Sequence, residues 1–151
     1  MTTNQKTTEV LNDLIQINND RIVGYEKAAN EAKKEPDLAS LFNDLAAESR
    51  AYVSELQSYV EQNGKEAAEG TTIKGKIYRA WMSVKATFSG NDRKAVLESC
   101  EFGEDAAQKA YKEALAETDL TSEARSVITD QKSKLKKSHD KVKRLRDMQP
   151  A

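Results

Sequence analysis

The fold follows from a stretch in the first half of the chain that reads LASLFNDLAAESRAYVSELQSYVEQN, residues 38–63. Its apolar residues recur at intervals of three and four, which places them on one face of an α-helix. Asp37 precedes the stretch as a predicted N-cap, and Asn63 with Gly64 is a typical stop signal. We therefore predict an amphipathic helix of about 26 residues, which is about 39 Å long. The residues of its inner face are Leu38, Leu41, Phe42, Leu45, Ser49, Tyr52, Leu56, Tyr59 and Val60.

Three further stretches of similar length show the same spacing and predict helices at about 8–33, 92–117 and 122–147. Thr7 and Thr121 are the predicted N-caps of the first and last of these helices, and Pro36 follows the end of the first. The alternation of apolar and polar residues that is typical of strands does not occur. Four amphipathic helices of matched length bury their apolar faces best against one another. The sequence therefore predicts a single all-α domain over residues 1–151, a four-helix bundle.

The connections between the helices select the topology of this bundle. About four residues separate the first helix from the second and the third from the fourth, so each pair is predicted to form an antiparallel hairpin. The connection at 64–91 is far longer, and Ile77, Trp81, Val84 and Phe88 predict a short amphipathic helix at about 74–88 within it. Such a crossover can return along the whole bundle, so that the third helix begins where the second begins. One long crossover is typical of ferritin-like bundles.

Composition excludes several classes of protein. Among 151 residues, Lys and Arg total 24 and Asp and Glu total 25, so the basic excess of a dedicated nucleic-acid binder is absent. No apolar run reaches the ~20 residues of a membrane span, and the first residues, MTTNQKTTEV, lack the apolar core of a signal peptide. A single cysteine forms no internal disulfide, so a cytoplasmic location is expected. With one histidine and no glycine-rich phosphate loop, the sequence favours a non-enzyme.

Acidic residues near one end of the predicted bundle suggest a metal site. The proposed topology places Glu26, Glu48, Glu101 and His139 within one helical turn of a common level, about 5 Å, and Glu104 one turn deeper. Bundles of this kind hold two metal ions between carboxylates and histidines on facing helices, and such ligands suit iron or manganese. These five residues are therefore the candidate ligands of a di-metal centre.

The same pattern is incomplete. Ala51 and Lys136 stand where a histidine and a glutamate would complete the two Glu-x-x-His motifs of such a centre. Arg50 and Lys136 would supply positive charge near the place where metal ions would sit. Glu26, Glu48 and Glu101 flank the apolar faces, a position at which glutamates usually form surface ion pairs. The favoured interpretation is a salt-bridged or hydrogen-bonded core without a metal cofactor.

Other residues have plainer predicted roles. Cys100 lies on an apolar face and is expected to be a small core residue with little thiolate character. Residues 132–146 are strongly basic, but the third helix is acidic, so we expect compensation between neighbouring helices and no nucleic-acid or membrane binding. Buried tyrosines need hydroxyl partners, which Asn18, Ser49, Gln131 and Ser138 can provide. The tyrosines concerned are Tyr25, Tyr52, Tyr59 and Tyr111.

Several short motifs carry a resemblance to a known family. They are LNDLI at 11–15, NND at 18–20, GYEKA at 24–28, RAWM at 79–82, GNDR at 90–93, CEFGED at 100–105 and SHDKV at 138–142. Through these motifs the chain resembles, over about residues 8–147, a bacterial family of ferritin-like four-helix-bundle proteins known as domain of unknown function 2383. The resemblance implies the fold, a cytoplasmic bacterial protein and a link to stress responses, and it implies no established reaction.

These observations lead to two main functional hypotheses, and a third, the binding of a polyanion or a membrane surface through residues 132–146, is the least favoured. The first is a non-catalytic, stress-associated bundle that acts through self-association, as a homodimer, or through a protein partner. The alternative is a di-metal binding protein or oxidoreductase that uses iron or manganese at the five candidate ligands.

Overall fold

The computed structural model describes residues 2–32, 34–62, 64 and 93–149, and these residues form four long helices. They are α1 (Thr3–Glu31), α2 (Pro36–Gln62), α4 (Arg93–Ala116) and α5 (Ser122–Asp147). The predicted all-α class is confirmed, since no strand occurs in these ranges. The short helix predicted at about 74–88, and the crossover apart from Gly64, lie outside the described residues. No helix in the described ranges is long and apolar enough to cross a membrane.

Two helix starts differ from the prediction. α1 begins at Thr3 rather than near residue 8, since Thr2 and Gln5 form a capping box in which each side chain accepts a hydrogen bond from the other's backbone N–H. Thr7 is therefore not an N-cap, and its buried hydroxyl accepts a hydrogen bond from Thr121 N at 3.1 Å. α2 begins at Pro36, a favoured first helical residue, so Asp37 lies inside the first turn.

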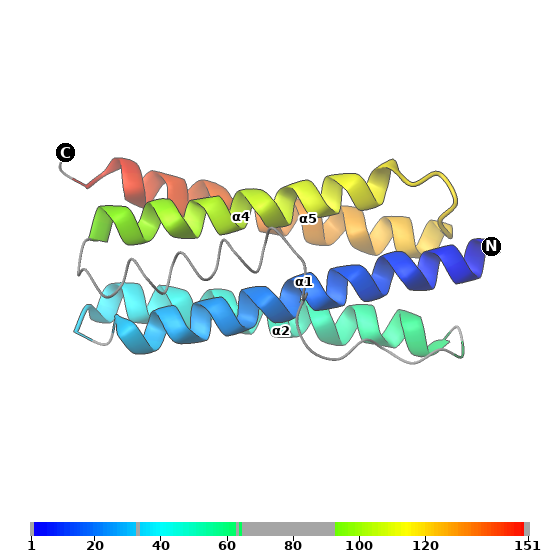
Figure 1. Ribbon diagram of the computed structural model, residues 1–151, viewed down its shortest axis with the longest axis horizontal. Helices are drawn as coiled ribbons and strands as arrows, with labels where there is room; N and C mark the ends of the chain where they lie inside the picture. The colour runs from blue at the N-terminus through cyan, green and yellow to red at the C-terminus, as the bar shows by residue number, and fades with distance from the viewer. Residues whose placement is uncertain (1, 33, 63, 65–92, 150–151) are drawn as a thin grey trace.

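The four helices form two hairpins, as predicted. α1 packs against α2, and α4 packs against α5, while α1 also contacts α4 and α2 contacts α5 (Figure 1). Contacts at the two ends of the bundle fix the directions of the helices. At one end Arg93 Nη2, at the start of α4, lies 2.7 Å from Asp37 Oδ2, at the start of α2. At the other end the backbone of Thr121, which precedes α5, bonds to Thr7 near the start of α1. α4 therefore begins where α2 begins.

The core has two apolar regions with a polar layer between them. One region surrounds Tyr25 and Phe42, whose rings stack with centroids 5.7 Å apart, and the other surrounds Leu56 and Leu135. The layer between them contains side chains that are polar and buried. Its members are Asn18, Arg21, Ser49, Glu104 and Ser138. Buried polar groups need hydrogen-bond partners, and in this layer many of those partners come from other helices. The layer is therefore the first candidate for a functional site.

Candidate functional site

A buried arginine lies at the centre of the polar layer. The Arg21 side chain, from α1, is completely removed from solvent, and its Nε and Nη2 donate hydrogen bonds to Glu104 Oε1 of α4 at 3.0 and 2.8 Å. The Tyr25 hydroxyl, one turn along α1, donates to the same oxygen, and the Arg21 guanidinium carbon lies 5.2 Å from the centre of the Tyr25 ring. Burial alone would lower the pKa of Arg21, but the nearby Glu104 and Glu48 outweigh it and raise that pKa. The core therefore contains a permanent cation.

The second edge of the guanidinium faces α2. Arg21 Nη1 donates to Ser49 Oγ at 2.7 Å and lies 3.2 Å from Glu48 Oε1. Glu48 in turn accepts hydrogen bonds from Ser138 Oγ of α5 at 2.9 and 3.0 Å. Arg21 and its partners thus join all four helices at one level of the bundle. We call Arg21, Glu48, Ser49, Glu104 and Ser138 the central network.

A second set of hydrogen bonds extends from Asn18. Asn18 Oδ1 accepts a hydrogen bond from Ser49 Oγ at 3.0 Å, and Asn18 Nδ2 donates to the Tyr111 hydroxyl at 2.7 Å. The Tyr111 hydroxyl donates to Gln131 Oε1, also at 2.7 Å. Two of the predicted tyrosine partners, Asn18 and Gln131, are therefore confirmed for Tyr111. The Tyr52 hydroxyl is buried without a hydrogen-bond partner among the described residues. Burial, and then the charge of the nearby Glu48, raise the pKa of Tyr52.

The structure separates the five predicted metal ligands into three places. Glu26 is half-exposed on the surface of α1 and pairs with Arg50 of α2 at 2.9 Å. Glu48 and Glu104 both contact Arg21 in the central network. Glu101 and His139 lie together on the face formed by α4 and α5. As placed here, the five residues do not fit a di-metal centre, because the Arg21 guanidinium stands between the buried Glu104 and the partly buried Glu48.

Sequence reasoning missed Arg21, although a signal was present. Positions 14, 18, 21, 25 and 28 continue one inner face of α1 at intervals of three and four, and position 21 is the charged member of that series. A charged residue on an inner face is almost never fully buried unless it is paired. Glu104 is likewise the charged member of the buried series on the inner face of α4. The pairing of Arg21 with Glu104 could therefore have been proposed from the sequences of the two inner faces.

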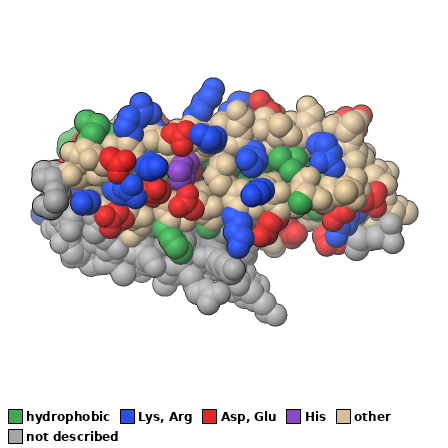
Figure 2. All heavy atoms as spheres, turned by 90° about the horizontal axis from the view of Figure 1, so that it is seen from above, with side chains coloured by type: hydrophobic (Ala, Val, Ile, Leu, Met, Phe, Trp, Pro, Cys, Tyr) green, Lys and Arg blue, Asp and Glu red, His purple; other side chains and the backbone are tan. Residues whose placement is uncertain are grey.

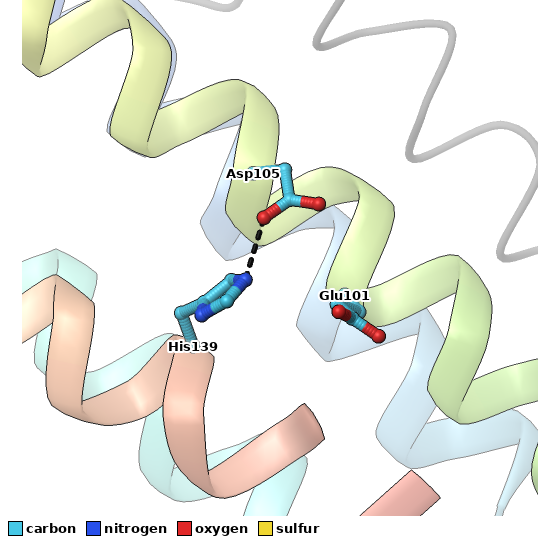
Figure 3. A group of neighbouring side chains, drawn as sticks. All are labelled: Glu101, Asp105 and His139. Atoms are coloured by element: carbon cyan, nitrogen blue, oxygen red, sulfur yellow. Dashed lines mark ion pairs between the residues drawn. The ribbon is translucent and has the colours of Figure 1, made fainter. Parts of the chain in front are cut away.

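A second group of charged residues lies on the α4–α5 face. Figure 3 shows Asp105 pointing at the ring of His139, and Glu101 one turn along α4 from Asp105. One ligand atom from each of these three residues lies within 4.8 Å of the other two. His139 Nε2 pairs with Asp105, while its Nδ1 lies 3.1 Å from Asp140 Oδ1. Glu101 forms an ion pair with Arg146 through Oε2.

On this face, acidic side chains are paired with His139 and Arg146. Figure 2 shows the chain's single histidine among acidic and basic side chains on the side of the molecule formed by α4 and α5. Partial burial lowers the pKa of His139, but the hydrogen bond with Asp140 and the charge of Asp105 outweigh it and raise that pKa. Sequence reasoning missed Asp105, for which the signal is its position four residues after Glu101 on the same helix face.

Comparison with known proteins adds a family. A family described as domain of unknown function (DUF2383) matches residues 6–117, which include almost all of α1 and the whole of α2 and α4. No curated protein matches the chain. The matched range holds Arg21, Glu48 and Glu104, whereas His139 on α5 lies beyond it.

Proposed function

The chain belongs to this family of unknown function, DUF2383, and we propose that it is a non-catalytic helical bundle that acts by self-association or by binding a protein partner. One observation carries the proposal, namely the ion pair between Arg21 and Glu104 in the core. Glu104, which is buried, and Glu48, whose side chain is 28% exposed, are the two inward carboxylates at this level, and both are engaged by a guanidinium that cannot lose its proton. Divalent ions at the same level of the bundle would lie beside the buried Arg21 cation, and this concentration of positive charge in the core is unfavourable.

We further propose that the bundle is ferritin-like. Two hairpins, with α4 beginning where α2 begins, are consistent with the single long crossover of that superfamily. On this view the Arg21 guanidinium takes the central position between facing carboxylates that metal ions take in the metal-binding members. The association with stress responses and the cytoplasmic location stay predictions from the sequence and its family resemblance.

A surface feature supports action by binding. Phe102 of α4 is 62% exposed, and it is the largest exposed apolar side chain among the described residues. An aromatic side chain of this kind is a typical anchor of a protein interface, since it buries much area at low entropic cost. Phe102 is followed two residues later by Glu104, so the surface of α4 that carries Phe102 is held in place by the central network.

The association can be tested through Phe102. We expect the full chain to sediment as a concentration-dependent dimer, or to capture a partner, and we expect Phe102→Ser to weaken that association by ~10-fold or more. Val23→Ser is the matched control, because Val23 is 41% exposed on α1 and its replacement removes a similar apolar contact from another surface. A wild-type chain that stays monomeric at all concentrations and binds no partner would contradict the proposal.

The interior can be tested by metal loading. The alternative di-metal function predicts about two iron or manganese ions per chain, bound by Glu26, Glu48, Glu101, Glu104 and His139. We expect at most about one ion per chain when the wild-type chain is loaded anaerobically with Fe²⁺ or with Mn²⁺, and we expect Glu104→Gln to leave that loading unchanged, since the central network holds no metal. About two ions per chain in the wild type, reduced by Glu104→Gln, would overturn the proposal.

A further inference from the structure

A group of three side chains on the α4–α5 face has the composition of a metal-binding site, outside the central network. Glu101 and Asp105 occur four residues apart on α4 and therefore share one face of that helix. His139 projects from α5, the helix that packs against α4. The three residues thus come from two helices held by the core of the hairpin, and helices position ligands more rigidly than loops do.

The spacing of the ligand atoms is close to that of a bound ion. One atom from each residue lies within 4.8 Å of the others. Two ligands at about 2.1 Å from a tetrahedral ion lie about 3.4 Å apart, so a pair at the outer limit of this range must approach by about 1.4 Å for an ion to bind. Asp105 is exposed and can supply this movement by rotation of its side chain.

The neighbours of the group resemble the outer partners of known metal sites. A histidine that binds metal through one ring nitrogen usually donates its other N–H to a carboxylate, which fixes the ring orientation. Here His139 Nδ1 lies 3.1 Å from Asp140 Oδ1, while Nε2 faces Asp105. Arg146 pairs with Oε2 of Glu101. This ion pair orients the carboxylate, and Oε1 is the oxygen that could bind the ion.

We propose that Glu101, Asp105 and His139 form a mononuclear site for a divalent transition-metal ion, with Asp140 as the outer partner of the histidine. One imidazole and two carboxylates suit Zn²⁺, Mn²⁺ or Fe²⁺, and three protein ligands leave a position open for water. The ion would replace the contact between His139 and Asp105, and it would stabilise the α4–α5 hairpin by binding the folded chain alone.

The single histidine gives a direct test with ZnCl₂. We expect calorimetric titration of the full chain to show one Zn²⁺ per chain, and we expect the ring proton resonances of His139 in NMR spectra to shift on Zn²⁺ addition. His139→Gln should abolish binding, and Asp105→Asn should weaken it by ~10-fold or more. Where Asp105→Asn does not fold, the resonances of His139 in the wild-type chain still report whether Zn²⁺ reaches the ring.

A matched pair of variants tests the outer partner. Asp140→Asn should weaken Zn²⁺ binding by about 10-fold, since it removes the negative charge that faces the second ring nitrogen. Asp130→Asn should leave binding unchanged, although Asp130 is similarly exposed on α5 and pairs with Lys134 just as Asp140 pairs with Lys136. The proposal is overturned if Zn²⁺ binds to less than half of the chains, or if binding persists undiminished in His139→Gln.

Discussion

Arg21 Nη2 on α1 lies 2.8 Å from Glu104 Oε1 on α4, and neither side chain is more than 1% exposed. Removing two charges from water is costly, and their attraction offsets this cost only when further hydrogen bonds satisfy both groups. Oε1 of Glu104 accepts three hydrogen bonds, whereas its Oε2 makes none to any described residue. The pair therefore specifies which faces of α1 and α4 meet, and it adds less to overall stability than its short distance suggests.

The first prediction concerns the removal of either partner. Arg21→Met and Glu104→Leu should each lower the free energy of unfolding by about 3–5 kcal/mol, because each leaves a buried charge without its closest ion-pair partner. The double variant should cost less than the sum of the two, since it leaves neither charge. Urea unfolding followed by circular dichroism measures all three values. Additive losses would contradict a direct coupling between the two residues.

The pair Glu26–Arg50 provides the control for burial. Its N–O distance of 2.9 Å is nearly the same as in the buried pair, but both side chains are half-exposed. Exposed ion pairs contribute about 0–1 kcal/mol, since water and salt screen them. We therefore expect Glu26→Gln to change the free energy of unfolding by less than about 1 kcal/mol. A loss as large as that of Glu104→Leu would mean that burial is not what makes the central pair costly to break.

The sequence was sufficient for the helices and their pairing because both depend on local spacing. The apolar period of residues 38–63 predicted α2 almost to its ends, and the short connections predicted the two hairpins. The start of α1 was placed five residues late because the Thr2–Gln5 capping box has no apolar periodicity to reveal it. Helix pairing follows from pattern, whereas a cap depends on a few local hydrogen bonds.

The candidate site was predicted less well. The prediction compared the heights of residues along the helix axes, and height does not fix the direction in which a side chain points around the axis. Each residue turns the helix by about 100°, so Glu26, one position after the buried Tyr25, points away from the core. Glu101 and Glu104 differ by about 60° around α4, which directs Glu104 inward and Glu101 toward α5. The partner of Glu104 is Arg21, whereas the sequence pattern pointed to Arg50 and Lys136 as the cations near the predicted centre.

The second prediction tests the hydrogen bonds of two buried tyrosines. Tyr111→Phe removes the hydroxyl that joins Asn18 Nδ2 to Gln131 Oε1, and it should lower the free energy of unfolding by about 1–3 kcal/mol because two buried amides lose a partner. Tyr52→Phe removes a buried hydroxyl that makes no hydrogen bond within the described ranges, and it should change this free energy by less than about 0.5 kcal/mol. Equal losses in the two variants would contradict the assignment.

The third prediction concerns pH and the contact between the starts of α2 and α4. The hydrogen bond from Arg93 lowers the pKa of Asp37 below its ordinary value of 3.8. A carboxyl group with a lowered pKa in the folded state contributes stability above its unfolded pKa, and this contribution is lost as the pH falls through the folded pKa. The wild-type chain should therefore lose more stability than Asp37→Asn between about pH 5 and pH 2.

The size of this pH effect is limited by solvent. Asp37 is exposed, so the difference between the wild type and Asp37→Asn should be at most about 1 kcal/mol. Urea unfolding at a series of pH values gives the difference directly. In Arg93→Gln the same Asp37→Asn change should have a smaller effect, because the hydrogen bond that lowers the pKa is already gone. Identical pH profiles for wild type and Asp37→Asn would contradict the role of this contact.

The last prediction concerns the reactivity of Cys100, the chain's single thiol. Its side chain is fully buried, and burial, followed by the charge of Glu104, raises the pKa of the thiol, which disfavours the thiolate that reacts. We expect no modification of the folded chain by iodoacetamide on the timescale in which one thiol per chain reacts in urea. Reaction of the folded chain then requires opening of the core, so its rate should rise in Arg21→Met as stability falls.

A surface thiol in the same fold calibrates that rate. Ser126 is exposed on α5, so Ser126→Cys combined with Cys100→Ala should react at the same rate in the folded and unfolded chains. Because Cys100 lies one turn from Glu104 on α4, its protection reports on the part of the core that the central network holds together. Modification of Cys100 in the folded wild type as fast as that of Ser126→Cys would mean that this part of the core opens freely. The central network would then not keep α4 closed against its neighbours.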